Sequence, residues 1–190
     1  VLGIWDEFYI DIREKERIEN CELFYKLSED FSTAFIHFEA TSTNNGVIEY
    51  TIYDKNGEKV ISTTESDFEL KNPKLWWCNG QGEPYLYSWT ARLLNTKSQV
   101  HGRVGFRKVE LTMNDNDWRA ENGTRAYPPM TLTLNGRIIF AKGSNWVNPE
   151  IFPGTITRDT YEPLIRLAKE AHMNIFRIWG GAIVNKDCFF

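Results

Sequence analysis

The chain has 190 residues, 42% of them hydrophobic and 25% charged, which is typical of an ordinary globular protein. Its formal net charge is -4 and it contains no Lys/Arg cluster, which argues against nucleic-acid binding because phosphate contacts need a concentrated basic surface. No apolar run approaches the roughly 18 residues that a membrane span requires. We therefore expect neither a nucleic-acid partner nor a membrane span.

The start of the sequence lacks the basic region of a signal peptide, so we expect it to lie inside a longer chain. The three cysteines, Cys21, Cys78 and Cys188, are odd in number and far apart, which indicates neither a disulfide framework nor a Cys-x-x-Cys metal site. We expect free thiols that are mostly buried. The three histidines also lack metal-ligand spacing, and neither a metal nor a cofactor is predicted.

Up to about Leu111, short stretches alternate between apolar and polar residues and are broken by Gly, Asn, Asp and Pro. This pattern is typical of antiparallel strands. The firmest predicted hairpin follows the alternating residues Ile48, Tyr50 and Ile52, because residues 54–57 read Asp-Lys-Asn-Gly and suit a tight turn. A further predicted strand buries one face, which carries Tyr85, Tyr87, Trp89, Ala91 and Leu93.

About seven such strands in roughly a hundred residues predict an immunoglobulin-like β-sandwich, which we place at residues 1–112. Its many aromatic residues are expected to pack in the core and at the edges. An exposed aromatic platform that binds carbohydrate is the alternative. Residues 113–129 are polar and irregular, end in Pro128-Pro129, and are predicted to be a linker. The triplet Asn122-Gly123-Thr124 within them matches a glycosylation sequon.

After this linker, the pair Asn135-Gly136 lies between two apolar stretches, residues 131–134 and 138–141, and predicts a hairpin that leads into a strand ending near Asn145. An amphipathic helix is then predicted to begin between Thr157 and Thr160, with Asp159 and Glu162 as a capping box. Its apolar residues recur at spacings of three and four: Tyr161, Leu164, Ile165, Ala168 and Ala171/His172.

A short apolar strand at residues 175–179 completes an order of strand, helix and strand, which predicts parallel pairing. We interpret residues 130–190 as the truncated first βαβ portion of a (β/α)8 TIM barrel. A full barrel takes about 250 residues. We therefore expect a multidomain fragment, an all-β sandwich followed by the start of a barrel, that is not itself a complete catalyst.

Functional residues of such barrels lie at the C-terminal ends of the strands and in the loops that follow. Tryptophan stacks on sugar faces, Asn and Glu bind hydroxyl groups, and Arg orients an acceptor or a carboxylate. The candidate substrate-binding residues are Asn145, Trp146, Glu150, Arg177 and Trp179. Barrel-core packing is the alternative for both tryptophans, a structural ion pair for Arg177, and a solvated loop or helix-capping charge for Glu150.

The same region resembles glycoside hydrolase family 2, and most of all its β-mannosidase branch. The barrel motifs that carry the resemblance are Leu134-Asn135-Gly136, Ala141-Lys142-Gly143-Ser144-Asn145-Trp146 and Phe176-Arg177-Ile178-Trp179-Gly180-Gly181. Those of the sandwich are Gly3-Ile4-Trp5, Pro73-x-Leu75-Trp76, Tyr85-Leu86-Tyr87 and Gly105-Phe106-Arg107. The chain departs from the branch at Cys78, where proline is usual, and at Asn148-Pro149-Glu150, where Pro-Ala-Asp is usual.

The resemblance implies a parent enzyme that is a retaining, exo-acting glycosidase of terminal β-mannosides, with one glutamate as acid/base and a second as nucleophile. In the family these glutamates lie on later barrel strands, so no catalytic residue is assigned in this chain. The implied partners are a β-linked glycoside and the remaining domains of the parent. A parent that is a β-galactosidase, β-glucuronidase or β-glucosaminidase remains open. So does a stand-alone immunoglobulin-like carbohydrate-binding or adhesion module.

Overall fold

A computed structural model describes residues 4, 6–113, 130–181 and 183–190. Contacts divide the chain into two compact units. The sandwich unit comprises residues 12–77 and 82–139, and the βα unit comprises residues 1–11, 78–81 and 140–190, each where described. The predicted linker, apart from Met113, and the sequon at Asn122 lie outside the described residues. Among the described helices, none combines the length and hydropathy that crossing a bilayer would need.

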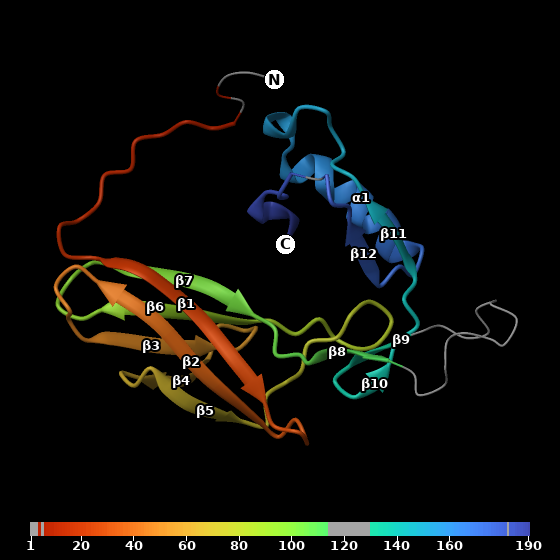
Figure 1. Cartoon of the computed structure of the whole chain (residues 1–190). Helices are drawn as coiled ribbons and strands as arrows, with labels where there is room; N and C mark the ends of the chain where they lie inside the picture. The colour runs from red at the N-terminus through yellow and green to blue at the C-terminus, as the bar shows by residue number, and fades with distance from the viewer. Residues whose placement is uncertain (1–3, 5, 114–129, 182) are drawn as a thin grey trace, which may run out of the picture. The chain divides into compact units, whose positions relative to one another are not determined.

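The sandwich unit is built from two antiparallel sheets that face each other (Figure 1). One sheet has the order β1-β2-β5 and consists of β1 (Ile18–Leu27), β2 (Thr33–Ser42) and β5 (Asp67–Lys71). The other has the order β4-β3-β6-β7 and consists of β3 (Ile48–Tyr53), β4 (Lys59–Thr63), β6 (Tyr87–Leu93) and β7 (Gln99–Val104). The predicted β-sandwich is confirmed.

The core lies between these sheets and follows the predicted alternation. Phe38 is 1% exposed and sits at its centre, with its ring 4.5 Å from that of Tyr50 and 5.3 Å from that of Trp89. The residues predicted to share the inner face of the strand around β6 are all buried: Tyr85, Tyr87, Trp89, Ala91 and Leu93. Most of the sandwich aromatics therefore serve packing, although Phe24 and Phe35 are about half exposed on the outer face.

The hairpin between β3 and β4 forms as predicted. The carboxylate of Asp54 accepts hydrogen bonds from the backbone N–H groups of Asn56 at 2.8 Å and Glu58 at 2.9 Å. Gly57 has a φ of +83°, a left-handed conformation that glycine adopts without a steric penalty. The Asp54 carboxylate thus serves as the hydrogen-bond acceptor for two backbone N–H groups of the turn.

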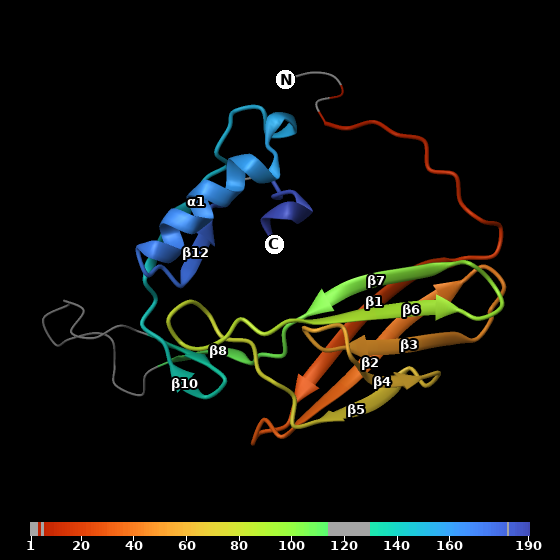
Figure 2. The same cartoon turned by 180° about the vertical axis from the view of Figure 1, so that it is seen from behind.

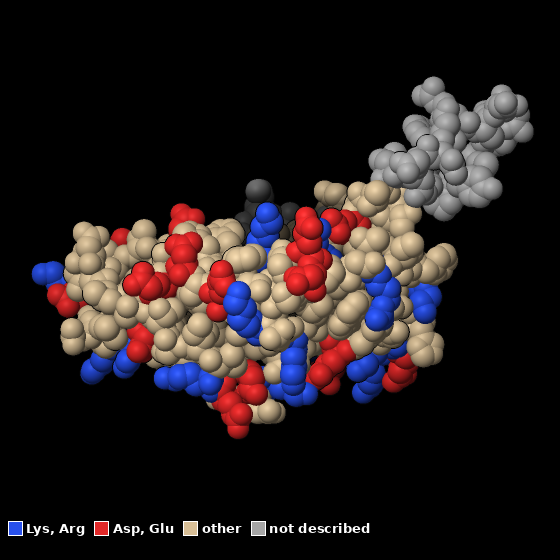
Figure 3. All heavy atoms as spheres, turned by 90° about the horizontal axis from the view of Figure 1, so that it is seen from below, with Lys and Arg blue, Asp and Glu red and all other residues tan. Residues whose placement is uncertain are grey.

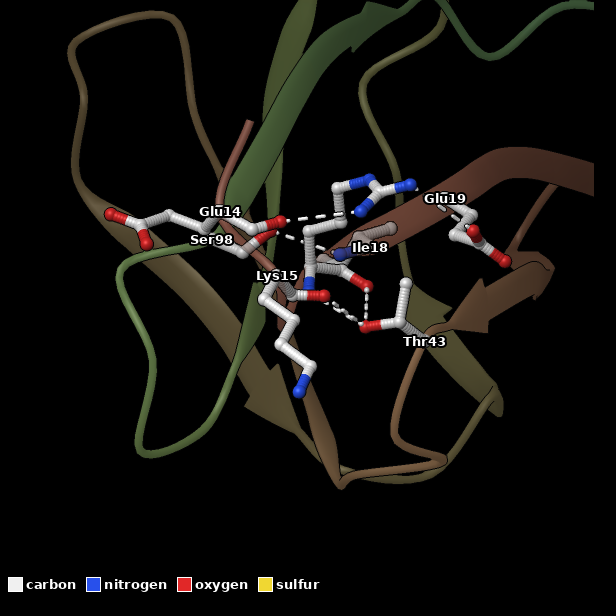
Figure 4. Close-up of polar contacts among 7 residues, drawn as sticks. Glu14, Lys15, Ile18, Glu19, Thr43 and Ser98 are labelled. Carbon is white, nitrogen blue, oxygen red and sulfur yellow. Dashed lines mark hydrogen bonds and ion pairs between the residues drawn. The ribbon is translucent and has the colours of Figure 1, made fainter. Parts of the chain in front are cut away.

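The first strand is held at its N-terminal end by side-chain hydrogen bonds (Figure 4). The backbone N–H of Arg17 donates to the Thr43 hydroxyl at 3.0 Å, and that hydroxyl donates to the carbonyl of Lys15 at 2.9 Å. The next residue, Ile18, donates its backbone N–H to the Ser98 hydroxyl at 2.9 Å. These contacts satisfy backbone groups at the edge of the sheet, where the regular ladder begins.

A third sheet of the same unit has three strands, β8 (Val109–Met113), β9 (Met130–Leu134) and β10 (Arg137–Ile138). The predicted Asn135-Gly136 turn is present, and both residues have positive φ, at 49° and 75°. The buried Asn135 side chain accepts from Lys108 N at 2.9 Å and donates to Trp76 O at 3.0 Å, so both its oxygen and its nitrogen have a backbone partner. The second hairpin strand ends at Ile138, and four residues separate it from the next strand, which begins at Gly143.

The βα unit contains β11 (Gly143–Trp146), α1 (Arg158–Glu170) and β12 (Ile175–Ile178), with short 3-10 turns η1 (Pro153–Thr155) and η2 (Asp187–Phe189). β11 and β12 pair in parallel, which confirms the predicted order of strand, helix and strand. The predicted capping box was wrong. The helix begins directly after Thr157, whose backbone N–H donates to the Thr160 hydroxyl at 3.2 Å, so Asp159 already lies inside the first turn.

Only part of the predicted apolar helix face is covered. Tyr161 and Ala168 are buried and Ile165 is partly buried, whereas Leu164 is 39% exposed and Ala171 is exposed. A sheet of two strands offers a narrow surface, so only the central stripe of the helix finds a partner.

The three thiols are free but differ in burial, contrary to the expectation that most would be buried. Cys78 is buried, Cys21 is partly buried and Cys188 is exposed. Burial, aided by the nearby carboxylate of Glu22, raises the pKa of the Cys21 thiol to about 11. Cys21 is thus a packing residue and a poor nucleophile at neutral pH.

We predict that Phe38→Ala lowers the free energy of unfolding of the sandwich by about 3–5 kcal/mol, because it leaves a cavity between the two sheets. Phe24→Ala is the matched control, since the same ring is removed from a position that is 47% exposed. It should cost about 1 kcal/mol or less. Urea unfolding followed by tryptophan fluorescence measures both, and equal losses would contradict the assigned faces.

Candidate functional site

The register between β11 and β12 sorts the predicted site residues onto two faces. Asn145 lies opposite Arg177, and Trp146 lies opposite Ile178. Because side chains alternate along a strand, Asn145 and Arg177 share one face and Trp146 shares the other with Phe176. Helix α1 covers the Trp146 face, where Tyr161 joins the same small core (Figure 2). Asn145 and Arg177 therefore lie on the face without a helix.

Asn145 and Arg177 contact each other across the two strands. A guanidinium N–H of Arg177 donates to the Asn145 side-chain oxygen at 3.2 Å, and both residues are exposed. Arginine carries five N–H donors and asparagine two, and among the described residues one of these seven is used within the pair, so others can meet an outside acceptor. Such a cluster suits the hydroxyl oxygens of a sugar, or a carboxylate.

Trp146 is 6% exposed and lies in the core of the βα unit. Its ring centre is 5.1 Å from that of Phe176 and 5.0 Å from that of Phe189, and its indole N–H donates to the side-chain oxygen of Asn185 at 3.2 Å. This is the packed position that the sequence left open as the alternative to lining a pocket. The backbone carbonyl of Trp146 accepts from Trp179 N at 3.5 Å, which joins the two strand ends.

Trp179 follows β12 and is 44% exposed. A Cβ at Gly181 would lie 2.7 Å from the Trp179 ring, so a larger residue there would require the indole to shift. The ring thus lies beside the Gly181 backbone and is partly open to solvent. An exposed indole held in this way can stack on an apolar sugar face.

Glu150 lies exposed in the segment between β11 and η1. Two residues before it, the side-chain nitrogen of Asn148 is buried and has no hydrogen-bond partner among the described residues. A buried donor without an acceptor is rare in folded proteins. This segment, which departs from the β-mannosidase pattern, thus presents one exposed carboxylate and one unused amide donor.

Sequence reasoning missed Asn185, a buried side chain in the segment after β12. Its oxygen accepts from Trp146 Nε1 and from the hydroxyl of Tyr161, both at 3.2 Å. Tyr161 also accepts from the backbone N–H of Lys186 at 3.4 Å. No periodic pattern marks an irregular segment of this kind, so nothing in the sequence distinguished Asn185 from a surface asparagine.

A hollow on the sandwich unit is lined by Tyr25, Phe35, Arg107 and Lys108 among others. Most of its polar groups already hold the fold together. The Tyr25 hydroxyl donates to the backbone of Arg107 at 3.0 Å, the Arg107 guanidinium lies 4.3 Å from the centre of the Trp76 ring, and the Lys108 ammonium is 2.8 Å from the Glu110 carboxylate. This hollow is thus a packing feature of the loop between β7 and β8.

Charged side chains of both signs lie close together on the one face that Figure 3 shows. On the face in Figure 3, Lys and Arg are interspersed with Asp and Glu, and no concentrated basic patch is visible there. This distribution agrees with the even scatter of charge along the sequence. A small ligand bound by local contacts suits such a surface better than a polyanion does.

Comparison with known proteins gives the family. The sequence model of "Glycosyl hydrolases family 2" matches residues 16–107. Beta-mannosidase B of Aspergillus clavatus is 25% identical over an alignment of 203 positions, which covers 99% of this chain and 23% of that protein. Beta-mannosidase A of the same organism is 30% identical over 140 residues, which cover 71% of this chain and 15% of that protein. The match thus spans less than a quarter of the length of either curated relative.

Solved structures show the same fold at low identity. A β-glucuronidase of Ruminococcus gnavus superposes with a TM-score of 0.68 at 17% identity, over 92% of this chain and 26% of that one. A β-glucuronidase of Parabacteroides merdae gives a TM-score of 0.67 at 18% identity, over 92% of this chain and 22% of that one. The match to the family model over residues 16–107 and the similarity to curated β-mannosidases place this chain in glycosyl hydrolases family 2.

Proposed function

We propose that this chain is part of a retaining, exo-acting glycoside hydrolase that removes terminal β-linked mannose from its substrate. The observation that carries the proposal is the alignment with beta-mannosidase B, which covers 99% of the chain. That similarity includes the strand ends that bear Asn145 and Arg177, as well as the sandwich. The parent enzyme would need no cofactor, because glycoside hydrolysis of this type uses carboxyl groups and water.

The proposed architecture is an immunoglobulin-like sandwich at residues 1–112, a linker at 113–129, and the start of a (β/α)8 barrel at 130–190. The strand orders β1-β2-β5 and β4-β3-β6-β7 support the sandwich type, since they correspond to the A-B-E and C′-C-F-G strands of that fold. The parallel β11–β12 pair with one covering helix supports the barrel. The likeness to the β-glucuronidase structure of Ruminococcus gnavus, which spans 92% of the chain, extends beyond the sandwich.

In a barrel of this kind the helices form the outer ring, and the opposite face of each strand points inward. The face of β11 and β12 away from α1 would therefore line the barrel interior. We assign Asn145 and Arg177 to sugar hydroxyl groups there, and Glu150 and Trp179 to contacts from the loops above. Trp146 would support this pocket from the helix-covered side, in keeping with its 6% exposure.

The chemistry itself belongs to other parts of the parent protein. Retaining hydrolysis needs two carboxyl groups about 5–5.5 Å apart, one as acid/base and one as nucleophile. Asn145 and Arg177 are not carboxyl groups, and Glu150 is exposed in a loop. The proposed role of this chain is thus to bind and orient the sugar, while the two glutamates come from later barrel strands.

A second candidate is a β-glucuronidase, because the guanidinium of Arg177 on the open face could bind the carboxylate of an acidic sugar. Solved structures similar to this chain include β-glucuronidases. At 17–18% identity, this similarity shows only that the fold is shared.

The two candidates separate in a substrate panel. The protein from the complete reading frame that contains this chain is assayed on 4-nitrophenyl β-mannoside, β-glucuronide, β-galactoside and β-N-acetylglucosaminide. We expect kcat/KM for the mannoside to exceed the others by at least about 100-fold. Residues 1–190 alone serve as a control and should be inactive. Preference for the glucuronide would contradict the β-mannosidase proposal, and hydrolysis of none would contradict the hydrolase proposal.

Arg177 provides a test of the site. Arg177→Ala in the complete protein should lower kcat/KM for the preferred glycoside by about 10- to 100-fold, because a charge-assisted hydrogen bond to the sugar is lost. Arg166→Ala is the matched control, since Arg166 is an exposed arginine of α1, on the covering helix. It should stay within about 2-fold of the wild type. Similar losses in both variants would show that Arg177 does not contact the substrate.

The retaining mechanism predicts the anomer that forms first. Proton NMR of the early reaction on a β-glycoside should show the β-anomer of the released sugar before mutarotation. Initial formation of the α-anomer would contradict retention and indicate direct attack by water.

A further inference from the structure

The strongest unassigned feature is the buried polar cluster around Asn185. Asn185 is 5% exposed, and its side-chain oxygen accepts from Trp146 Nε1 and the Tyr161 hydroxyl, both at 3.2 Å. The donors come from the end of β11 and from α1, and the acceptor comes from the segment after β12. One amide oxygen thus joins three parts of the unit.

The neighbouring residue extends this cluster to the loop after β11. The backbone N–H of Lys186 donates to the Tyr161 hydroxyl at 3.4 Å, and its ammonium donates to the carbonyl of Gly154 in η1 at 3.1 Å. The segment with Glu150 leads into η1, and the segment with Trp179 leads to Asn185. Asn185 and Lys186 therefore tie together the two loops that follow the strand ends.

The cluster lies directly behind the proposed sugar contacts. Trp146 is the next residue after Asn145, so fixing its indole also fixes the backbone from which the Asn145 side chain projects. The Trp146 carbonyl accepts from Trp179 N at 3.5 Å, so the position of the Trp146 backbone also restrains the end of β12. Supporting hydrogen bonds of this kind orient binding groups without touching the ligand.

We infer that Asn185 is a positioning residue for the sugar pocket, which holds the strand-end residues Asn145 and Trp179 in place through Trp146 and the two loops. The inference rests on the proposed function, because it needs a sugar bound at these strand ends. It assigns Asn185 no direct contact with substrate. Loss of its oxygen should therefore weaken substrate binding more than it slows the chemical step.

A second asparagine of the same unit offers a matched control. Asn174 also links the two strands, since its side chain accepts from Lys142 N at 2.8 Å and donates to Phe140 O at 3.0 Å. These contacts lie at the N-terminal ends of β11 and β12, away from the proposed pocket. A purely structural contribution to the unit would therefore appear in both asparagine variants, and a positioning effect only in that of Asn185.

The experiment compares Asn185→Leu, Asn185→Asp and Asn174→Leu in the complete protein, on whichever glycoside of the panel the wild type cleaves best. Asn185→Leu should raise KM by about 10-fold or more while kcat changes by less than about 3-fold. Asn185→Asp keeps an oxygen acceptor for both donors and should restore KM to within about 3-fold of the wild type. Asn174→Leu should lower the melting temperature but leave KM unchanged.

Tyr161→Phe is the milder variant if Asn185→Leu fails to fold, because it removes one donor to Asn185 and keeps the ring. It should raise KM by about 3-fold or more. Equal KM values in wild type, Asn185→Leu and Tyr161→Phe would overturn the inference and leave the proposed function intact, as would equal increases in the Asn185 and Asn174 variants. A wild-type protein that cleaves no glycoside of the panel would overturn both.

Discussion

The parallel register between β11 and β12 is the constraint on which the proposed site depends. It places Asn145 opposite Arg177 and Trp146 opposite Ile178. Alternation along the strands then gives the βα unit one apolar face, which α1 covers, and one polar face, which it does not. A shift of β12 by a single residue would bring the Arg177 guanidinium to the face that α1 covers and turn Phe176 away from it. The contact of the Phe176 ring with Trp146, 5.1 Å between ring centres, would then be lost, which makes such a shift costly.

In each unit, a buried asparagine side chain provides hydrogen-bond partners for other buried polar groups. Asn135 satisfies Lys108 N and Trp76 O in the sandwich unit, and Asn185 satisfies the indole of Trp146 and the hydroxyl of Tyr161 in the βα unit. A carboxamide carries no charge, so its burial avoids the large desolvation cost of a carboxylate. Each side chain fixes irregular backbone that no sheet ladder reaches. Segments without regular secondary structure can then hold one conformation.

Local chemistry made much of the fold predictable. The alternation of Ile48, Tyr50 and Ile52 and the turn residue Asp54 each act within a few residues, so their sequence pattern was sufficient. The exposure of Leu164 was not predictable, because it depends on how many strands stand beneath the helix. The cap was misassigned to Asp159, because Thr157 and Thr160 bond to each other without the acidic residue that the usual box contains. The two faces of the site could not be assigned without the strand register. The role of Asn185 could not be predicted, because it depends on contacts among three segments that only the fold brings together.

Binding of a sugar on the open face of β11 and β12 is the central claim, and a crystal structure of the complete protein with a mannose-shaped competitive inhibitor tests it most directly. We expect sugar hydroxyl oxygens within about 3.2 Å of the Asn145 amide and the Arg177 guanidinium. We also expect the Trp146 ring to stay on the helix side, bonded to Asn185. An inhibitor bound elsewhere, or an Arg177 side chain enclosed in an ion pair with another barrel strand, would contradict the claim.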